Sequence, residues 1–117
     1  ANPGRWPLEW RAAMAARIAS LNGLGDLARY YLASVRDPAI RALAEPGSEG
    51  RDEVEALVLR FVDRVAGSPR DIHAEDIAAL QGAGIADADI VRLCELNAFL
   101  AYQCQVAYGV ALMEAAR

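Results

Sequence analysis

The chain has 117 residues and a mass of 12.6 kDa, a length that fits one domain with one hydrophobic core. Its net charge is −4 and its twelve basic residues are all arginines spread along the chain, which excludes the basic face that nucleic acid requires. Hydrophobic residues make up 55% of so small a chain, so we expect another copy to cover part of an apolar surface.

The first predicted helix covers about residues 7–22. Pro7 suits a first helical turn, and Asn22-Gly23 is a typical helix end. Spacings of four, four and three residues place an apolar stripe on one face of this helix, formed by Trp10, Met14, Ile18 and Leu21.

A second helix follows the turn at Gly25-Asp26, with an apolar repeat that continues until Asp37-Pro38 ends it. The repeat consists of Leu27, Tyr31 and Val35. A short third helix is predicted from Pro38. The segment EPGSEGRDE then predicts a loop near residues 46–51, between two halves of a single domain that spans residues 1–117.

The second half begins with the strongest amphipathic pattern in the chain, which starts at Asp52. Its apolar positions are Val54, Leu57, Val58, Phe61, Val62 and Val65. AGSPRD ends this helix, AEDIAALQ forms a brief one, and Asp87 is the expected N-cap of a last helix over residues 88–115. No stretch alternates long enough to predict a strand, so we predict an all-α bundle of five to seven helices.

The segment from residue 96 to residue 113 contains no charged residue, and its length is at the threshold for a helix that crosses a membrane. Asn97, Gln103 and Gln105 interrupt the segment, which favours a helix buried in a soluble bundle. These amides would then need hydrogen-bond partners inside the bundle or across an interface. We therefore expect no membrane partner.

Cys94 and Cys104 belong to no CxxC and no Cys/His cluster, so we expect neither a metal site nor a cofactor. Ten residues along one helix rise about 15 Å, too far for a disulfide between them. They are interpreted as buried thiols in a reducing compartment, and we expect a cytoplasmic protein.

The C-terminal half, from EALVLRF to AYGVAL, resembles the alkylhydroperoxidase D-like and carboxymuconolactone decarboxylase superfamily, particularly its peroxidase-related branch. The features that match are DIAALQGAG (residues 76–84), Asp89-Ile90 at the start of the long helix and Gly109-Val110 near its end. In the first half, RAAMAARIASLNG is similar to the Arg-rich helix ending in Asn-Gly that precedes CxxCxxxH in that superfamily. The resemblance covers roughly residues 8–113 and implies an alkylhydroperoxidase D-like helical fold.

The residues that the resemblance associates with redox chemistry are replaced here. The two motif cysteines would fall at Leu24 and Leu27, the histidine at Tyr31, and an upstream glutamate near Ala12. Peroxide reduction needs an attacking thiolate and a resolving thiol within bonding reach. Because Leu24 and Leu27 share a helix face, they are more simply explained as core residues.

Four residues remain as candidates for catalysis. Tyr31 could act as a general acid or a substrate hydrogen-bond donor, although a buried tyrosine with a bonded hydroxyl is the commoner role. His73, the only histidine, precedes AEDIAAL and is expected to cap that helix or face solvent. Cys104 lacks a nearby cation that would favour a thiolate, and Cys94, between Arg92 and Glu95, has a somewhat better setting but is still interpreted as structural.

Two further groups of residues are candidate sites. Glu75 and Asp76 are adjacent and point in different directions, so a catalytic carboxylate pair with Glu9 is disfavoured, and acids are common in a first helical turn. An aromatic set could line a small-molecule pocket, and a core edge or subunit contact explains it equally well. The set consists of Trp6, Trp10, Tyr30 and Tyr31.

Three hypotheses follow. The leading one is a redox-degenerate, alkylhydroperoxidase D-like domain that forms a homo-oligomer (dimer, trimer or hexamer) and serves as a scaffold or non-catalytic subunit. The second is a non-redox enzyme of the carboxymuconolactone decarboxylase type, acting on a small acid or lactone through Tyr31 with an arginine holding a carboxylate. The third is a module that binds a small-molecule ligand at its aromatic residues.

Overall fold

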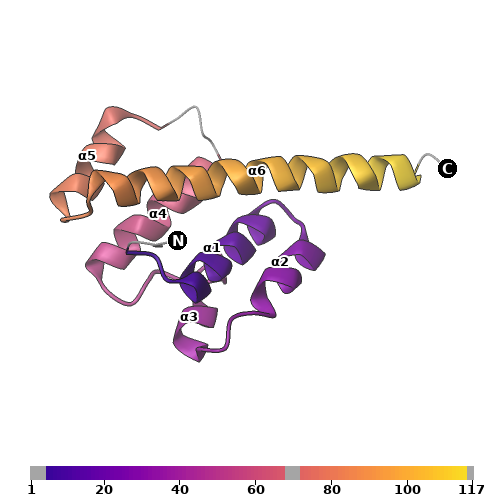
Figure 1. Cartoon of the computed structure of the whole chain (residues 1–117), viewed down its shortest axis with the longest axis horizontal. Coiled ribbons are helices and arrows are strands. Elements are labelled where there is room, and N and C mark those ends of the chain that lie inside the picture. The colour runs from indigo at the N-terminus through magenta and orange to yellow at the C-terminus, as the bar shows by residue number, and fades with distance from the viewer. Residues whose placement is uncertain (1–4, 68–71, 116–117) are drawn as a thin grey trace.

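A computed structural model describes residues 5–67 and 72–115 of the chain. These residues form six helices and no strand, so the predicted all-α class is confirmed. The long helix α6 crosses one side of the molecule, and α1 and α2 form an antiparallel hairpin beneath it (Figure 1). The helices are α1 (Leu8–Leu21), α2 (Gly25–Leu32), α3 (Pro38–Ala42), α4 (Glu53–Gly67), α5 (Ala74–Gly82) and α6 (Asp87–Ala115).

Helix α1 is the centre of the fold, because it packs against α2, α3, α4 and α6. Trp10, Met14 and Ile18 of the predicted stripe are buried, whereas Leu21 at the helix end is 42% exposed. Alanines surround the stripe on α1, and their small side chains let neighbouring helices approach closely. Every residue from 13 to 19 is therefore buried.

Helix α2 is shorter than its apolar pattern predicts. It ends at Leu32, and Val35 is buried in the connection to α3 rather than on a helical face. The side chain of Asp37 accepts a hydrogen bond from the Ala39 N–H and caps α3. Residues 33–37 are therefore not helical, but the side chain of Val35 still packs in the core.

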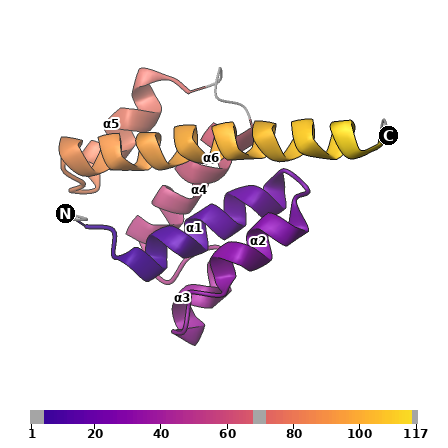
Figure 2. The same cartoon turned by 45° about the vertical axis from the view of Figure 1, so that its right-hand side comes forward.

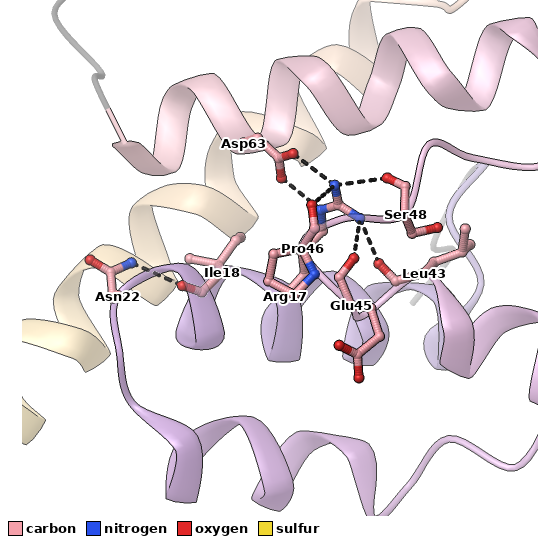
Figure 3. Close-up of polar contacts among 8 residues, drawn as sticks. All are labelled: Arg17, Ile18, Asn22, Leu43, Glu45, Pro46, Ser48 and Asp63. Carbon is pink, nitrogen blue, oxygen red and sulfur yellow. Dashed lines mark hydrogen bonds and ion pairs between the residues drawn. The ribbon is translucent and has the colours of Figure 1, made fainter.

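A buried arginine joins α1 to the predicted loop near residues 46–51. Arg17 is 2% exposed, and its Nε and Nη2 donate to the two carboxylate oxygens of Asp63 on α4 at 2.6 and 2.7 Å. The same guanidinium donates to four backbone carbonyls at 2.9–3.0 Å (Figure 3). They belong to Leu43, Glu45, Pro46 and Ser48. We call this set of contacts the Arg17 cluster. It holds the α3–α4 connection against the core.

Helix α4 behaves as its amphipathic pattern predicts. Val58, Phe61 and Val62 are buried, together with Leu59. Part of the predicted terminator AGSPRD, residues 68–71, lies outside the described residues. Helix α5 then packs against α4 and α6 and is joined to α4 by an ion pair between Arg64 and Asp76 at 3.1 Å.

Helix α6 departs most from expectation. Its first half is buried at Ile90, Leu93 and Leu100, but its second half extends beyond α1 and α2 in both views (Figures 1 and 2). The sequence pattern of the uncharged segment 96–113 indicated a buried helix. The structure shows that this segment is not buried over its full length. The prediction failed because the core ends near Cys104, the last buried residue of the described chain.

Exposed apolar side chains follow one face of α6 from its middle to its end. Spacings of three, four, four and three residues bring them to the same side of the helix, and we call them the α6 stripe. The α6 stripe consists of Phe99 (53% exposed), Tyr102 (65%), Val106 (47%), Val110 (49%) and Met113 (68%).

The three amides of α6 have different environments. The Asn97 side chain is buried and donates to the Leu93 carbonyl at 2.9 Å, while its Oδ1 has no partner within the described residues. Gln103 accepts a hydrogen bond from the Tyr31 hydroxyl, and Gln105 is exposed. Asp87 is the first residue of α6 rather than its N-cap, and its carboxylate accepts a hydrogen bond from Gln81 at 2.8 Å.

Candidate functional site

A cavity of about 640 Å³ that opens to solvent lies where α1, α2 and α6 meet. Helix α1 lines it with the side chains at positions 8, 11, 12 and 15, which share one face. The opposite walls come from α2 with the two residues that follow it, and from the middle of α6. The full lining is Leu8, Arg11, Ala12, Ala15, Tyr30, Tyr31, Ala33, Ser34, Leu96, Phe99 and Leu100.

Arg11 is the one formally charged residue in this lining. Its Nε is buried and has no hydrogen-bond partner within residues 5–67 and 72–115, and no carboxylate there forms an ion pair with it. A buried N–H without a partner is uncommon in folded proteins and is costly. Arg11 therefore brings an unpartnered donor and a positive charge to an otherwise neutral wall. Sequence reasoning did not single out Arg11.

Tyr31 lines the same cavity and is half-buried. Its hydroxyl donates a hydrogen bond to the Gln103 Oε1 and so has a partner within the protein. Burial raises the Tyr31 pKa, against the opposing effect of the Gln103 hydrogen bond. The phenol therefore stays protonated near neutral pH and is unsuited to act as a base.

The four positions implicated by the resemblance separate into two pairs. Ala12 and Tyr31 line the cavity, whereas Leu24 and Leu27 are absent from its lining. Both leucines are half-buried and pack against the core, but Leu24 is the N-cap residue of α2 and does not share a helix face with Leu27. Neither motif position therefore carries a thiol.

The two cysteines are both on α6 and unpaired. They line a separate cavity of about 320 Å³, on a side of α6 that also includes Asn97 and Tyr108. Cys104 is buried, and burial raises its pKa. Cys94 is exposed, contrary to the expectation of a buried thiol, yet partial desolvation and then the charge of Glu95 raise its pKa. Neither thiol is activated as a nucleophile.

His73 is exposed at the N-cap position of α5. The capping hydrogen bond uses its backbone: the His73 N–H donates to the Asp76 carboxylate at 2.8 Å. Glu75 is exposed on α5, while Glu9 on α1 accepts hydrogen bonds from the backbone N–H groups of Arg36 and Asp37. The three acids therefore form no carboxylate pair.

The aromatic set divides into two pairs. Trp6 and Trp10 are buried and stacked, with ring centroids 4.5 Å apart, and the Trp6 Nε1 donates to the Asp89 carbonyl at 2.9 Å. Tyr30 and Tyr31 meet edge to face at 5.2 Å and line the large cavity. The tryptophans anchor the start of the chain to the core, and the tyrosines alone take part in the candidate site.

Searches of protein-family models, curated proteins and solved structures find no match to this chain. No helix of the described ranges combines the length and hydropathy needed to cross a membrane. In the same part of the chain, His, Cys, Asp and Glu side chains form no group of three or more that could hold a metal ion. The function must therefore be argued from the cavity and the exposed surface.

Proposed function

We propose that the chain is a redox-degenerate, alkylhydroperoxidase D-like domain that self-associates in the cytoplasm as a scaffold or non-catalytic subunit. The family part of this proposal rests on the sequence patterns around residues 76–84 and 109–110. The absence of thiol peroxidase activity is supported by the two core-packed leucines, Leu24 and Leu27, and by the raised pKa of both cysteines. The two free thiols fit a reducing compartment.

Self-association is supported by the α6 stripe. Five large apolar side chains are about half or more exposed along one helix face, and the segment from residue 96 to residue 113 has no charge to repel another copy. Contiguous apolar surface on a helix is typical of protein interfaces. We infer that the α6 stripes of two copies cover each other in the smallest assembly, and that a trimer or hexamer would add further contacts.

Light scattering on a sizing column tests the self-association. Wild type at micromolar concentration should have at least the mass of a dimer, and Val106→Glu should be a monomer with unchanged helix content. Ala111→Glu is the matched control, because residue 111 is also exposed but lies about 140° around the helix from residue 106. A wild-type monomer under these conditions would contradict the proposal.

A peroxide consumption assay with a dithiol reductant tests the redox part. We expect no activity above background in wild type or in Cys94→Ser/Cys104→Ser, because neither thiol is stabilised as a thiolate. Activity in wild type that disappears in the double variant would show that thiol chemistry takes place on α6, and the proposal would fail.

The hypothesis of a non-redox enzyme is supported only in part. A cavity does open beside Tyr31, as that hypothesis requires. However, the described lining contains no carboxylate, histidine or thiol to act as a base, and the Tyr31 hydroxyl is already bonded to Gln103. Of the two alternatives, binding without turnover fits the cavity better than acid–base catalysis.

A further inference from the structure

We propose that the cavity between α1, α2 and α6 binds a small apolar monocarboxylic acid. The carboxylate would bind the Arg11 guanidinium, and the apolar body would lie against Leu96, Phe99 and Leu100 of α6. This inference does not depend on self-association or on the family resemblance.

The first argument is charge. Arg11 places a permanent cation on a wall without a carboxylate, and its Nε lacks a partner among the described residues. Arginine presents a planar set of N–H groups that matches a carboxylate, and bonds of this kind are stronger than those between neutral groups. A bound carboxylate would supply both the missing acceptor and the missing counter-charge.

The second argument is size and polarity. A volume of about 640 Å³ lies within the usual range for small-ligand sites. Apart from Arg11, the polar side chains of the lining are Ser34 and two tyrosines, and Ser34 Oγ already donates to the Tyr31 carbonyl. A sugar or a polyanion would leave most of its polar groups unsatisfied there, and a cation would be repelled. One negative charge on an apolar body is the chemistry that fits.

The third argument concerns the competing occupant, a second copy of the chain. The α6 stripe begins at Phe99, which also lines the cavity, so another copy could approach this rim. However, the segment from residue 96 to residue 113 is uncharged, so a second α6 could reach Arg11 only with a carboxylate that flanks this segment, Glu95 or Glu114. A small acid needs no such alignment of a second copy, because its carboxylate can bind the guanidinium directly.

The test is isothermal titration calorimetry with octanoate, kept below its critical micelle concentration, and with 1-octanol and octylamine as chain-matched probes. Wild type should bind octanoate with measurable affinity, bind 1-octanol at least about tenfold more weakly, and not bind octylamine. Octanoate binding that is no tighter than 1-octanol binding, or no octanoate binding at all, would overturn the proposal.

Three variants locate the site. Arg11→Gln should weaken octanoate binding at least about tenfold, and Arg60→Gln, an exposed arginine on α4, should leave it within about twofold. Ala33→Phe should also weaken binding, because it fills the cavity from an exposed lining position that the core does not need. Unchanged affinity in both Arg11→Gln and Ala33→Phe would place octanoate elsewhere and overturn the assignment.

Discussion

Arg17 and Arg11 are six residues apart on α1, and their charges are accommodated in opposite ways. Arg17 is almost completely buried, and its donors are taken up by a carboxylate and four carbonyls. Arg11 is half-buried beside a cavity, with a buried Nε that lacks a partner among the described residues. The bonded Arg17 cation is a structural element, whereas the donor of Arg11 remains available for the ligand that we propose.

The largest effect is expected at Arg17. Arg17→Met should lower the free energy of unfolding by about 3–5 kcal/mol, because Asp63 loses its counter-ion and the loop carbonyls lose their donor. Urea unfolding followed by circular dichroism measures this change. Arg60→Met, at an exposed position, serves as the control and should change it by less than about 0.5 kcal/mol. A similar small change for both variants would show that the Arg17 cluster contributes little.

Gly50 tests the loop that the Arg17 cluster holds. Its φ is +97°, and an added Cβ would lie 2.7 Å from the Ala56 backbone nitrogen in the first turns of α4. Gly50→Ala should therefore cost about 2–3 kcal/mol in the same urea experiment, from strain together with overlap.

Gly84→Ala separates the effect of backbone strain from the effect of steric overlap. Gly84 also has a positive φ, +89°, but an added Cβ there meets no atom within 4 Å. Strain alone should cost about 1 kcal/mol. Equal losses at Gly50 and Gly84 would mean that the loop yields to the added methyl group and is less firmly held than the Arg17 cluster implies.

The smallest effect on stability is expected at Arg11. Arg11→Gln should change the free energy of unfolding by no more than about 0.5 kcal/mol, because the described chain gives this side chain no ion pair to lose. The same variant should lose octanoate affinity. Destabilisation comparable to that of Arg17→Met would remove the distinction between the two arginines.

The positions of the helices could be predicted from local patterns. Residues 7–22 and the segment beginning at Asp52 have apolar spacings and end signals that need no knowledge of distant residues, and both form helices within a few residues of the expected ends. The exposure of the α6 stripe could not be predicted in this way. Apolar composition shows that a helix needs cover, but not whether its own chain provides that cover.

The roles of Arg17 and Arg11 could not be predicted from local patterns for another reason. The partners of Arg17 are 26–46 residues away, in a loop and on the polar side of α4, so only the fold brings them together. One signal was available: Arg17 interrupts a run of small and apolar residues on α1, where a charge must be satisfied or exposed. The sequence pointed to Tyr31 as one residue of the candidate site. The cavity beside Arg11 could not be predicted, because it depends on how α1, α2 and α6 pack together.

The Arg17 cluster also has a practical consequence for engineering. Pro46, Gly47 and Gly50 give the α3–α4 connection the composition of a surface loop that accepts insertions. Because Arg17 binds its carbonyls at Glu45, Pro46 and Ser48, a tag or an inserted sequence there would pull those acceptors away from a buried charge. This connection is therefore an unsuitable site for inserting an epitope or splitting the chain, despite its loop composition.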